Sequence, residues 1–150
     1  MKWMAPLFAT AVQACAPAAP PDAPTRAAVQ AQAVPGCGDF LAATGKKPPQ
    51  AEFVDCISDP GRQGKPLHAR YRVPSKDAAA VEDYLVEAVG LIRLQRSCCR
   101  WDGPAASFRD ESGRDYSLLL LSPETPARDR REWPGSPPFE IWVDMFTEEI

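Results

Sequence analysis

The sequence predicts an α+β domain, in which one main helix packs on an antiparallel sheet of about six strands and two disulfides cross-link the chain. Residues 77–89 have helical periodicity, and segments of alternating apolar and polar residues lie before and after them. Helices and strands do not alternate along the chain, which argues against a βαβ nucleotide-binding fold. The composition, 45% hydrophobic and 25% charged over 150 residues, is typical of a single soluble domain.

The main helix is the most clearly marked element. Ser75 is a suitable N-cap, and Asp77 lies in the first turn, where the helix dipole favours a negative charge. The expected buried face holds Val81, Tyr84, Leu85, Ala88 and Val89, and the expected solvent face holds Glu82, Asp83 and Glu87. Gly90 is expected to end the helix, because glycine readily adopts the left-handed conformation of a C-cap.

The strands are indicated by alternation and by turn residues. They are expected at residues 52–57, 67–73, 91–101, 116–121 and 139–145. Turns are expected at residues 59–61 and 110–113. Four consecutive leucines, 118–121, predict a central strand covered on both faces. Short helical segments are expected at residues 39–44 and 125–132, the latter ended by Trp133-Pro134-Gly135.

The N-terminus indicates export. Residues 1–14 are predicted to be a signal peptide, since Lys2 precedes an apolar stretch much shorter than the roughly 20 residues that span a bilayer. Val12-Gln13-Ala14-Cys15 resembles the bacterial lipoprotein cleavage box, although Gln13 stands where a smaller residue is typical, and ordinary signal cleavage is the alternative. Residues 15–36 would then supply the lipidated Cys15 and an Ala/Pro-rich tether, and residues 37–150 the domain. We expect a protein of the cell envelope, on the periplasmic side, either lipid-anchored or secreted.

The cysteines fit an oxidising compartment. With Cys15 lipidated, an even number remains for two disulfides: Cys37, Cys56, Cys98 and Cys99. Neighbouring side chains on a strand point to opposite faces, so Cys98 and Cys99 are expected to bond separately to Cys37 and Cys56. The sequence has no Cys-x-x-Cys pair and no neighbouring histidines, as a zinc site would need, and no metal is expected.

No catalytic constellation is evident. The sequence has no dinucleotide fingerprint, P-loop or nucleophile elbow, so no cofactor is expected. A hydrolase using Cys56 with His68, the single histidine, stays as an alternative that would need one cysteine to remain reduced. Asp110 and Glu111 are interpreted as turn residues rather than as a glycosidase pair, and Asp55 as a satisfied polar residue in an apolar strand.

Charge is segregated along the chain. Residues 60–76 and 91–101 contain basic residues and no acid, whereas the segment from residue 139 contains acids and no base. Arg70, Arg72 and Arg93 could form a basic sheet face that binds an acidic protein or a cell-wall carboxylate. The simpler interpretation is that these arginines pair with Glu140 and Asp144. The net charge of −3 provides no attraction for nucleic acid, and none is expected as a partner.

The last strand is apolar on both faces, because Trp142 and Phe146 lie opposite the row of residues 139–145. An exposed aromatic pair there would suit a partner interface. The simpler expectation is that the segment holding Trp133 covers both side chains.

A series of short motifs runs through the predicted domain. They are Cys37-Gly38-Asp39-Phe40, Lys47-Pro48-Pro49, Glu52-Phe53-x-x-Cys56, Gln63, Leu67-x-Ala69-x-Tyr71-x-Val73, Val81-Glu82, Cys98-Cys99-x-Trp101, Ser122-x-Glu124-Thr125 and Arg131-x-Trp133. In this order they resemble a family of small bacterial envelope proteins catalogued only as a domain of unknown function, over most of residues 37–146. The resemblance implies export and an α+β fold, and it implies no activity.

These features together predict a non-enzymatic envelope lipoprotein whose domain binds a protein or cell-wall partner. An inhibitor or immunity-type protein that blocks a secreted or cell-wall-directed enzyme is one such class. The membrane would be contacted only through the N-terminal lipid. The candidate binding residues are Arg70, Arg72, Arg93 and Trp142. A structural envelope component without a ligand site is the alternative.

Overall fold

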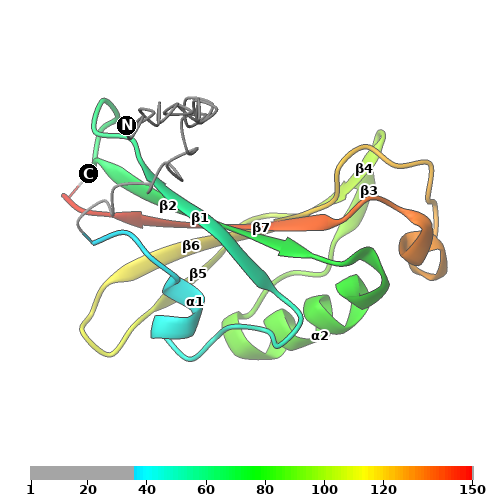
Figure 1. The fold of residues 1–150 in the computed structure, drawn as a ribbon, viewed down its shortest axis with the longest axis horizontal. Coiled ribbons are helices and arrows are strands. Elements are labelled where there is room, and N and C mark those ends of the chain that lie inside the picture. Colours follow the sequence, from blue (N-terminus) through cyan, green and yellow to red (C-terminus); the bar gives the residue numbers. More distant parts are fainter. Residues whose placement is uncertain (1–35, 150) are drawn as a thin grey trace, which may run out of the picture. The chain divides into compact units, whose positions relative to one another are not determined.

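A computed structural model describes residues 36–149 of the chain (Figure 1). The expected signal peptide, Cys15 and nearly all of the expected tether lie outside the described residues. The elements are α1 (Phe40–Ala43), β1 (Glu52–Ser58), β2 (Pro66–Val73), η1 (Ser75–Asp77), α2 (Ala78–Val89), β3 (Gln95–Ser97), β4 (Arg100–Asp102), β5 (Ala106–Arg109), β6 (Asp115–Leu121), η2 (Arg130–Gly135) and β7 (Phe139–Phe146), where η marks a 3-10 helix.

Five strands form one antiparallel sheet in the order β1-β2-β7-β6-β5. The two longest strands, β2 and β7, pair along their whole length, with Pro66 opposite Phe146 and Val73 opposite Phe139. A domain of helices and an antiparallel sheet is therefore confirmed, with five strands in the main sheet and a separate two-stranded sheet, β3-β4.

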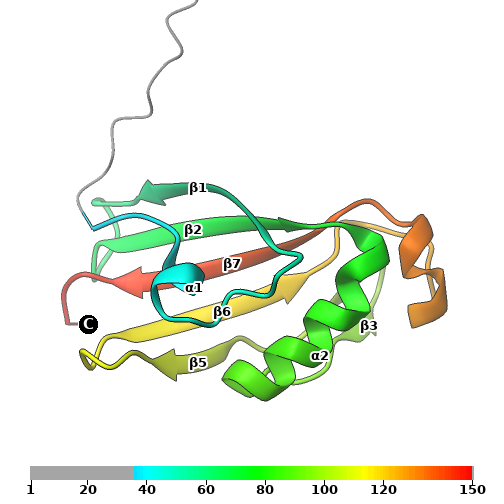
Figure 2. The ribbon, with the colours of Figure 1, turned by 60° about the horizontal axis from the view of Figure 1, so that its bottom comes forward.

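Helices α1 and α2 lie on one side of the main sheet (Figures 1 and 2). Helix α2 packs Val81 and Leu85 against it, and Gly90 ends the helix with φ of 72°, as expected. Ser75 does not cap α2, because it lies in the 3-10 turn before the helix and its hydroxyl donates to the Pro134 carbonyl at 3.2 Å. The core between the layers is built from buried residues of α1, α2 and alternate positions of the strands.

The predicted strand over residues 91–101 is wrong. Its first half, residues 91–94, is irregular, because the buried carboxylate of Glu82 accepts the Leu94 N–H and holds this segment at α2. Its second half belongs to the β3-β4 hairpin, whose turn is formed by Cys98 and Cys99. The main sheet is one strand smaller than expected as a result.

The expected disulfide pairing is also wrong. Cys37 is bonded to Cys56, and Cys98 is bonded to Cys99. The alternation of side chains applies to strands, whereas Cys98 and Cys99 form a turn in which Cys98 has a φ of 49°. The presence of two disulfides, one of them fastening the segment at Cys37 to the sheet, agrees with the prediction.

Two further expectations need correction. Residues 125–129 are not helical; the helical turn is η2, which includes Trp133-Pro134-Gly135 instead of ending before them. Strand β6 is internal, but it is not covered on both faces. Leu118 and Leu120 are fully buried, and Leu119 and Leu121 are only half-buried on the other face.

Candidate functional site

The side of the main sheet that faces away from the helices is the candidate site. Opposed residues of antiparallel strands share a face, so the register identifies its members. We call this surface the open face, and it comprises Glu52, Asp55, Ile57, His68, Arg70, Arg72, Ser117, Leu119, Leu121, Glu140, Trp142, Asp144 and Phe146. All of these are half-buried or exposed, in contrast to the buried residues that alternate with them on β2, β6 and β7.

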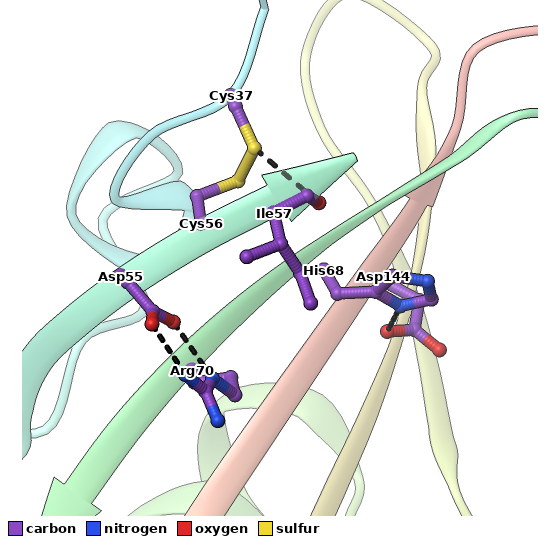
Figure 3. Close-up of a disulfide and its surroundings, with 7 residues drawn as sticks. All are labelled: Cys37, Asp55, Cys56, Ile57, His68, Arg70 and Asp144. Carbon is purple, nitrogen blue, oxygen red and sulfur yellow. Dashed lines mark hydrogen bonds and ion pairs between the residues drawn. A yellow bond between two sulfur atoms is a disulfide. The ribbon is translucent and has the colours of Figure 1, made fainter. Parts of the chain in front are cut away.

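Arg70 lies at the centre of the open face and is held on two sides. Its Nε donates to Asp55 Oδ1 at 2.7 Å, and its Nη2 donates to Asp55 Oδ2 (Figure 3). On the other side, its guanidinium carbon lies 5.7 Å from the ring centroid of Trp142. The hydrogen bonds from Arg70 hold the pKa of Asp55 below its ordinary value. This arrangement fixes the orientation of a charged group and an aromatic ring that remain accessible to a partner.

A second pair of polar side chains, His68 and Asp144, lies on the open face two residues further along β2 and β7. His68 Nδ1 and Asp144 Oδ1 are 2.7 Å apart (Figure 3), and Ile57 faces His68 from β1. Cys56 is opposite Ala69, on the helix side of the sheet, and its sulfur is bonded to Cys37. The structure therefore does not bring Cys56 and His68 together as a nucleophile and base.

Three of the four predicted binding residues share the open face, namely Arg70, Arg72 and Trp142. Arg93 does not; it lies after α2, where its Nη1 is 2.7 Å from Asp83 Oδ1. The predicted basic face of three arginines is wrong, because residues 91–94 are not part of the sheet.

The partner of Arg70 also differs from the expected one. Arg70 pairs with Asp55 of β1 rather than with Glu140 or Asp144 of β7. Sequence reasoning missed this pair and the His68–Asp144 pair. Charged residues alternate with apolar ones along these neighbouring strands, but this pattern identifies the pairs only when the register of the strands is known.

Trp142 is half-buried, and its indole N–H donates to Glu140 at 2.9 Å. The expectation that the Trp133 segment covers Trp142 and Phe146 is wrong. Trp133 packs on the helix side instead, against Phe139 with ring centroids 4.9 Å apart, because η2 turns towards the core. Phe146 is 40% exposed.

A shallow hollow of about 520 Å³ adjoins the centre of the open face. Its walls include Val54, Arg70, Arg72, Pro123, Pro137, Pro138 and Glu140. Among the described residues, the exposed Arg72 forms no ion pair. The hollow is therefore lined by three prolines and by one arginine without an ion-pair partner among the described residues.

Within residues 36–149, no three His, Cys, Asp or Glu side chains gather as they would around a metal ion. Asp110 stabilises the turn before β6, where it accepts hydrogen bonds from Ser112 Oγ and the Arg114 N–H. None of the helices between residues 36 and 149 is long and apolar enough to cross a bilayer.

Together, the fold and the open face define a small helix-and-sheet protein with an uncovered, preorganised sheet surface. The chain belongs to the family described as domain of unknown function DUF4952, whose model matches residues 25–101. The resemblance to a family catalogued only as a domain of unknown function is thereby confirmed. No curated protein and no solved structure matches the chain.

The motif residues that carry the resemblance lie mainly away from the open face. Near the N-terminus of the domain, Asp39 caps α1 and binds Lys47 Nζ at 2.6 Å, and the Tyr71 hydroxyl accepts the Leu41 N–H at 3.0 Å. Burial opposes ionisation of Asp39, but the hydrogen bonds from Lys47 and the Ala42 N–H outweigh it and lower its pKa. These motif residues therefore hold the framework of the domain.

Proposed function

We propose that this protein is an exported envelope protein, anchored by a lipid on Cys15, whose domain binds another protein through the open face. The observation that supports this most directly is the Asp55–Arg70–Trp142 arrangement at the centre of that face. Aromatic and arginine side chains dominate the binding energy of protein interfaces, especially near their centre. Groups that are already oriented lose less conformational entropy on binding.

The charges of the open face favour a protein partner over a cell-wall polyanion. Arg70 is neutralised by Asp55, and Arg72 is opposite Glu140, so positive and negative groups alternate across the strands. A polyanion needs a uniformly basic surface, whereas a protein surface can present complementary charges of both signs. The apolar part, which includes Ile57 at 46% and Phe146 at 40% exposure, also fits the interior of a protein interface.

An inhibitor or immunity-type role is the form of binding that we propose. Such proteins need a rigid surface, and here the surface is an antiparallel sheet braced by α2 and by the Cys37–Cys56 bond. The Ala/Pro-rich segment before the domain would act as a spacer between the lipid and that surface. The target would be an enzyme that is secreted or directed at the cell wall.

Site-specific photo-crosslinking tests this proposal. A photoreactive residue at Ile57, on the open face, is compared with one at Ile92, which is 59% exposed and lies off that face. We expect one envelope protein to crosslink from position 57 and not from position 92. Equal crosslinking from both positions, or none from position 57, would contradict the proposal and favour a structural component without a ligand site.

The captured protein is then purified, and its affinity is measured with Trp142→Ala and with Arg93→Ala as the matched control. We expect Trp142→Ala to weaken binding by about 2 kcal/mol, or about 30-fold in Kd. Arg93→Ala should leave the Kd unchanged, because Arg93 lies off the open face. Unchanged affinity in Trp142→Ala, with the fold retained, would exclude the open face as the binding surface.

The anchor is tested separately by the intact mass of the exported protein. We expect an acylated N-terminal Cys15 and loss of residues 1–14. A chain with intact residues 1–14 would contradict export by this route, whatever the crosslinking shows.

A further inference from the structure

The two disulfides differ in span and exposure. Cys37 and Cys56 are 19 residues apart, join the start of the domain to β1, and are both half-buried against the core (Figure 3). Cys98 and Cys99 are adjacent, form the tip of the β3-β4 hairpin, and are both exposed. Exposed disulfides are the ones that exchange readily with external thiols, whereas buried structural ones resist reduction.

We propose that Cys98–Cys99 is a site of reversible thiol–disulfide exchange with a dithiol partner, such as the paired thiols of an oxidoreductase. A partner thiolate attacks one sulfur, the Cys98–Cys99 bond breaks, and the other sulfur leaves as a thiolate that takes up a proton. The second partner thiol then attacks the mixed disulfide and releases the first cysteine as a thiol. Two electrons and two protons pass to Cys98 and Cys99, and the partner becomes a disulfide.

The fold can tolerate this reduction. A bond between adjacent residues closes no loop of intervening chain, so it hardly restricts the unfolded state. The hairpin is also fastened by other contacts, which lie around the buried Trp101. The Trp101 N–H donates to Ser122 Oγ at 2.8 Å, the Ser122 N–H donates to the Trp101 carbonyl at 2.8 Å, and the indole N–H donates to the Ala127 carbonyl at 3.0 Å.

Reduction nevertheless changes the hairpin tip. Cys98 has a φ of 49°, in the left-handed region that non-glycine residues rarely occupy, and opening the ring allows it to leave that conformation. The next carbonyl, that of Cys99, accepts the Thr125 N–H at 2.8 Å. Movement of the tip is therefore transmitted to residues 122–125.

This region borders the open face. Cys98 and Cys99 line a hollow of about 310 Å³ together with Ser97, Arg100, Leu121, Ser122, Pro123 and Glu124. Pro123 is also a wall of the larger hollow beside Arg70 and Arg72. The redox state of Cys98 and Cys99 thus alters one rim of the open face, although the exchange itself does not depend on the proposed binding function.

The test uses the full-length exported protein in graded dithiothreitol without denaturant, followed by rapid alkylation and peptide mapping. Trypsin releases residues 97–100 as one peptide that carries both Cys98 and Cys99. We expect this peptide to gain two alkyl groups at a dithiothreitol concentration at least tenfold lower than that needed to open Cys37–Cys56. Oxidised dithiothreitol should restore the bond. Opening of Cys37–Cys56 first, or resistance of Cys98–Cys99 until the protein unfolds, would overturn the proposal.

Hydrogen exchange tests whether the redox state of Cys98 and Cys99 affects residues 122–125 at the edge of the open face. We expect the Thr125 amide to exchange at least several-fold faster in the reduced protein, and equally fast in the Cys98→Ser/Cys99→Ser variant without reductant. The amide of Val143, in the centre of the sheet, serves as the reference and should not change. An unchanged Thr125 rate in both samples would show that the redox state does not reach the open face.

Discussion

Arg130 and Glu82 are 48 residues apart in sequence and form a two-point ion pair, with Nε–Oε2 and Nη2–Oε1 distances of 2.9 Å each. Glu82 is fully buried on α2 and also accepts the Leu94 N–H at 2.7 Å. The Arg130 guanidinium lies 5.2 Å from the ring centroids of both Trp101 and Trp133. This carboxylate therefore joins α2, the segment after it, and η2.

We predict that Glu82→Ala lowers the free energy of unfolding by about 3–5 kcal/mol, because it removes the counter-charge of the half-buried Arg130 guanidinium and leaves the buried Leu94 N–H without its acceptor. Urea unfolding measures the change. Asp83→Ala is the matched control, since the Asp83 side chain is 61% exposed in its pair with Arg93 and should cost no more than about 1 kcal/mol. An equal loss of unfolding free energy in the two variants would show that the burial of Glu82 does not contribute to stability.

The same pair shows where prediction from sequence ends. Helical periodicity correctly predicts α2, but it places Glu82 on the solvent face. The carboxylate is buried because Arg130, far along the chain, supplies its counter-charge. Local patterns carry no information on such a partner.

The sequence likewise predicts only part of the open face. Alternation predicts β2 and β7 and hence the shared face of Arg70, Arg72 and Trp142. It fails at Arg93, because an apolar run after a helix resembles a strand even when it packs against that helix. The pairing of Arg70 with Asp55 depends on the β1-β2 register, which a bulge between Phe53 and Asp55 shifts by one residue.

The two disulfides should differ in their contribution to stability. We predict that Cys37→Ser/Cys56→Ser lowers the free energy of unfolding by about 3 kcal/mol, because a cross-link over 19 residues restricts the unfolded chain. Cys98→Ser/Cys99→Ser should change it by less than about 1 kcal/mol, since that bond closes no intervening loop. Chemical denaturation of both variants under non-reducing conditions measures these changes in the free energy of unfolding. A larger loss for the second variant would mean that the hairpin tip is a stabilising element.

Asp110 should make stability depend on pH in the acid range. Hydrogen bonds from Ser112 Oγ and the Arg114 N–H lower the pKa of Asp110 from 3.8 to about 2. A folded-state pKa below the unfolded value stabilises the protein above pH 4, and that contribution is lost as the pH falls from about 4 to about 2. We therefore predict that Asp110→Asn is less stable than the wild type at pH 6 and that the difference shrinks steadily as the pH falls towards 2.

Thermal unfolding at a series of pH values measures this difference in Tm. Glu111→Gln is the control, because Glu111 is an exposed neighbour in the same turn and its replacement should leave the Tm at pH 6 unchanged. A difference in Tm between wild type and Asp110→Asn that is as large at pH 2 as at pH 6 would assign the effect to the shape of the side chain rather than to its charge.

The hydroxyl of Tyr71 joins α1 to the sheet, since it accepts the Leu41 N–H at 3.0 Å and both residues are buried. We predict that Tyr71→Phe lowers the free energy of unfolding by about 1–3 kcal/mol, because it leaves a buried N–H unsatisfied while keeping the ring in place. Tyr84→Phe on α2 should be nearly neutral, since the Tyr84 hydroxyl has no hydrogen-bond partner among the described residues. Faster hydrogen exchange at Leu41 in Tyr71→Phe would locate the loss at α1, whereas unchanged exchange and stability would show that this hydrogen bond does not hold α1 on the sheet.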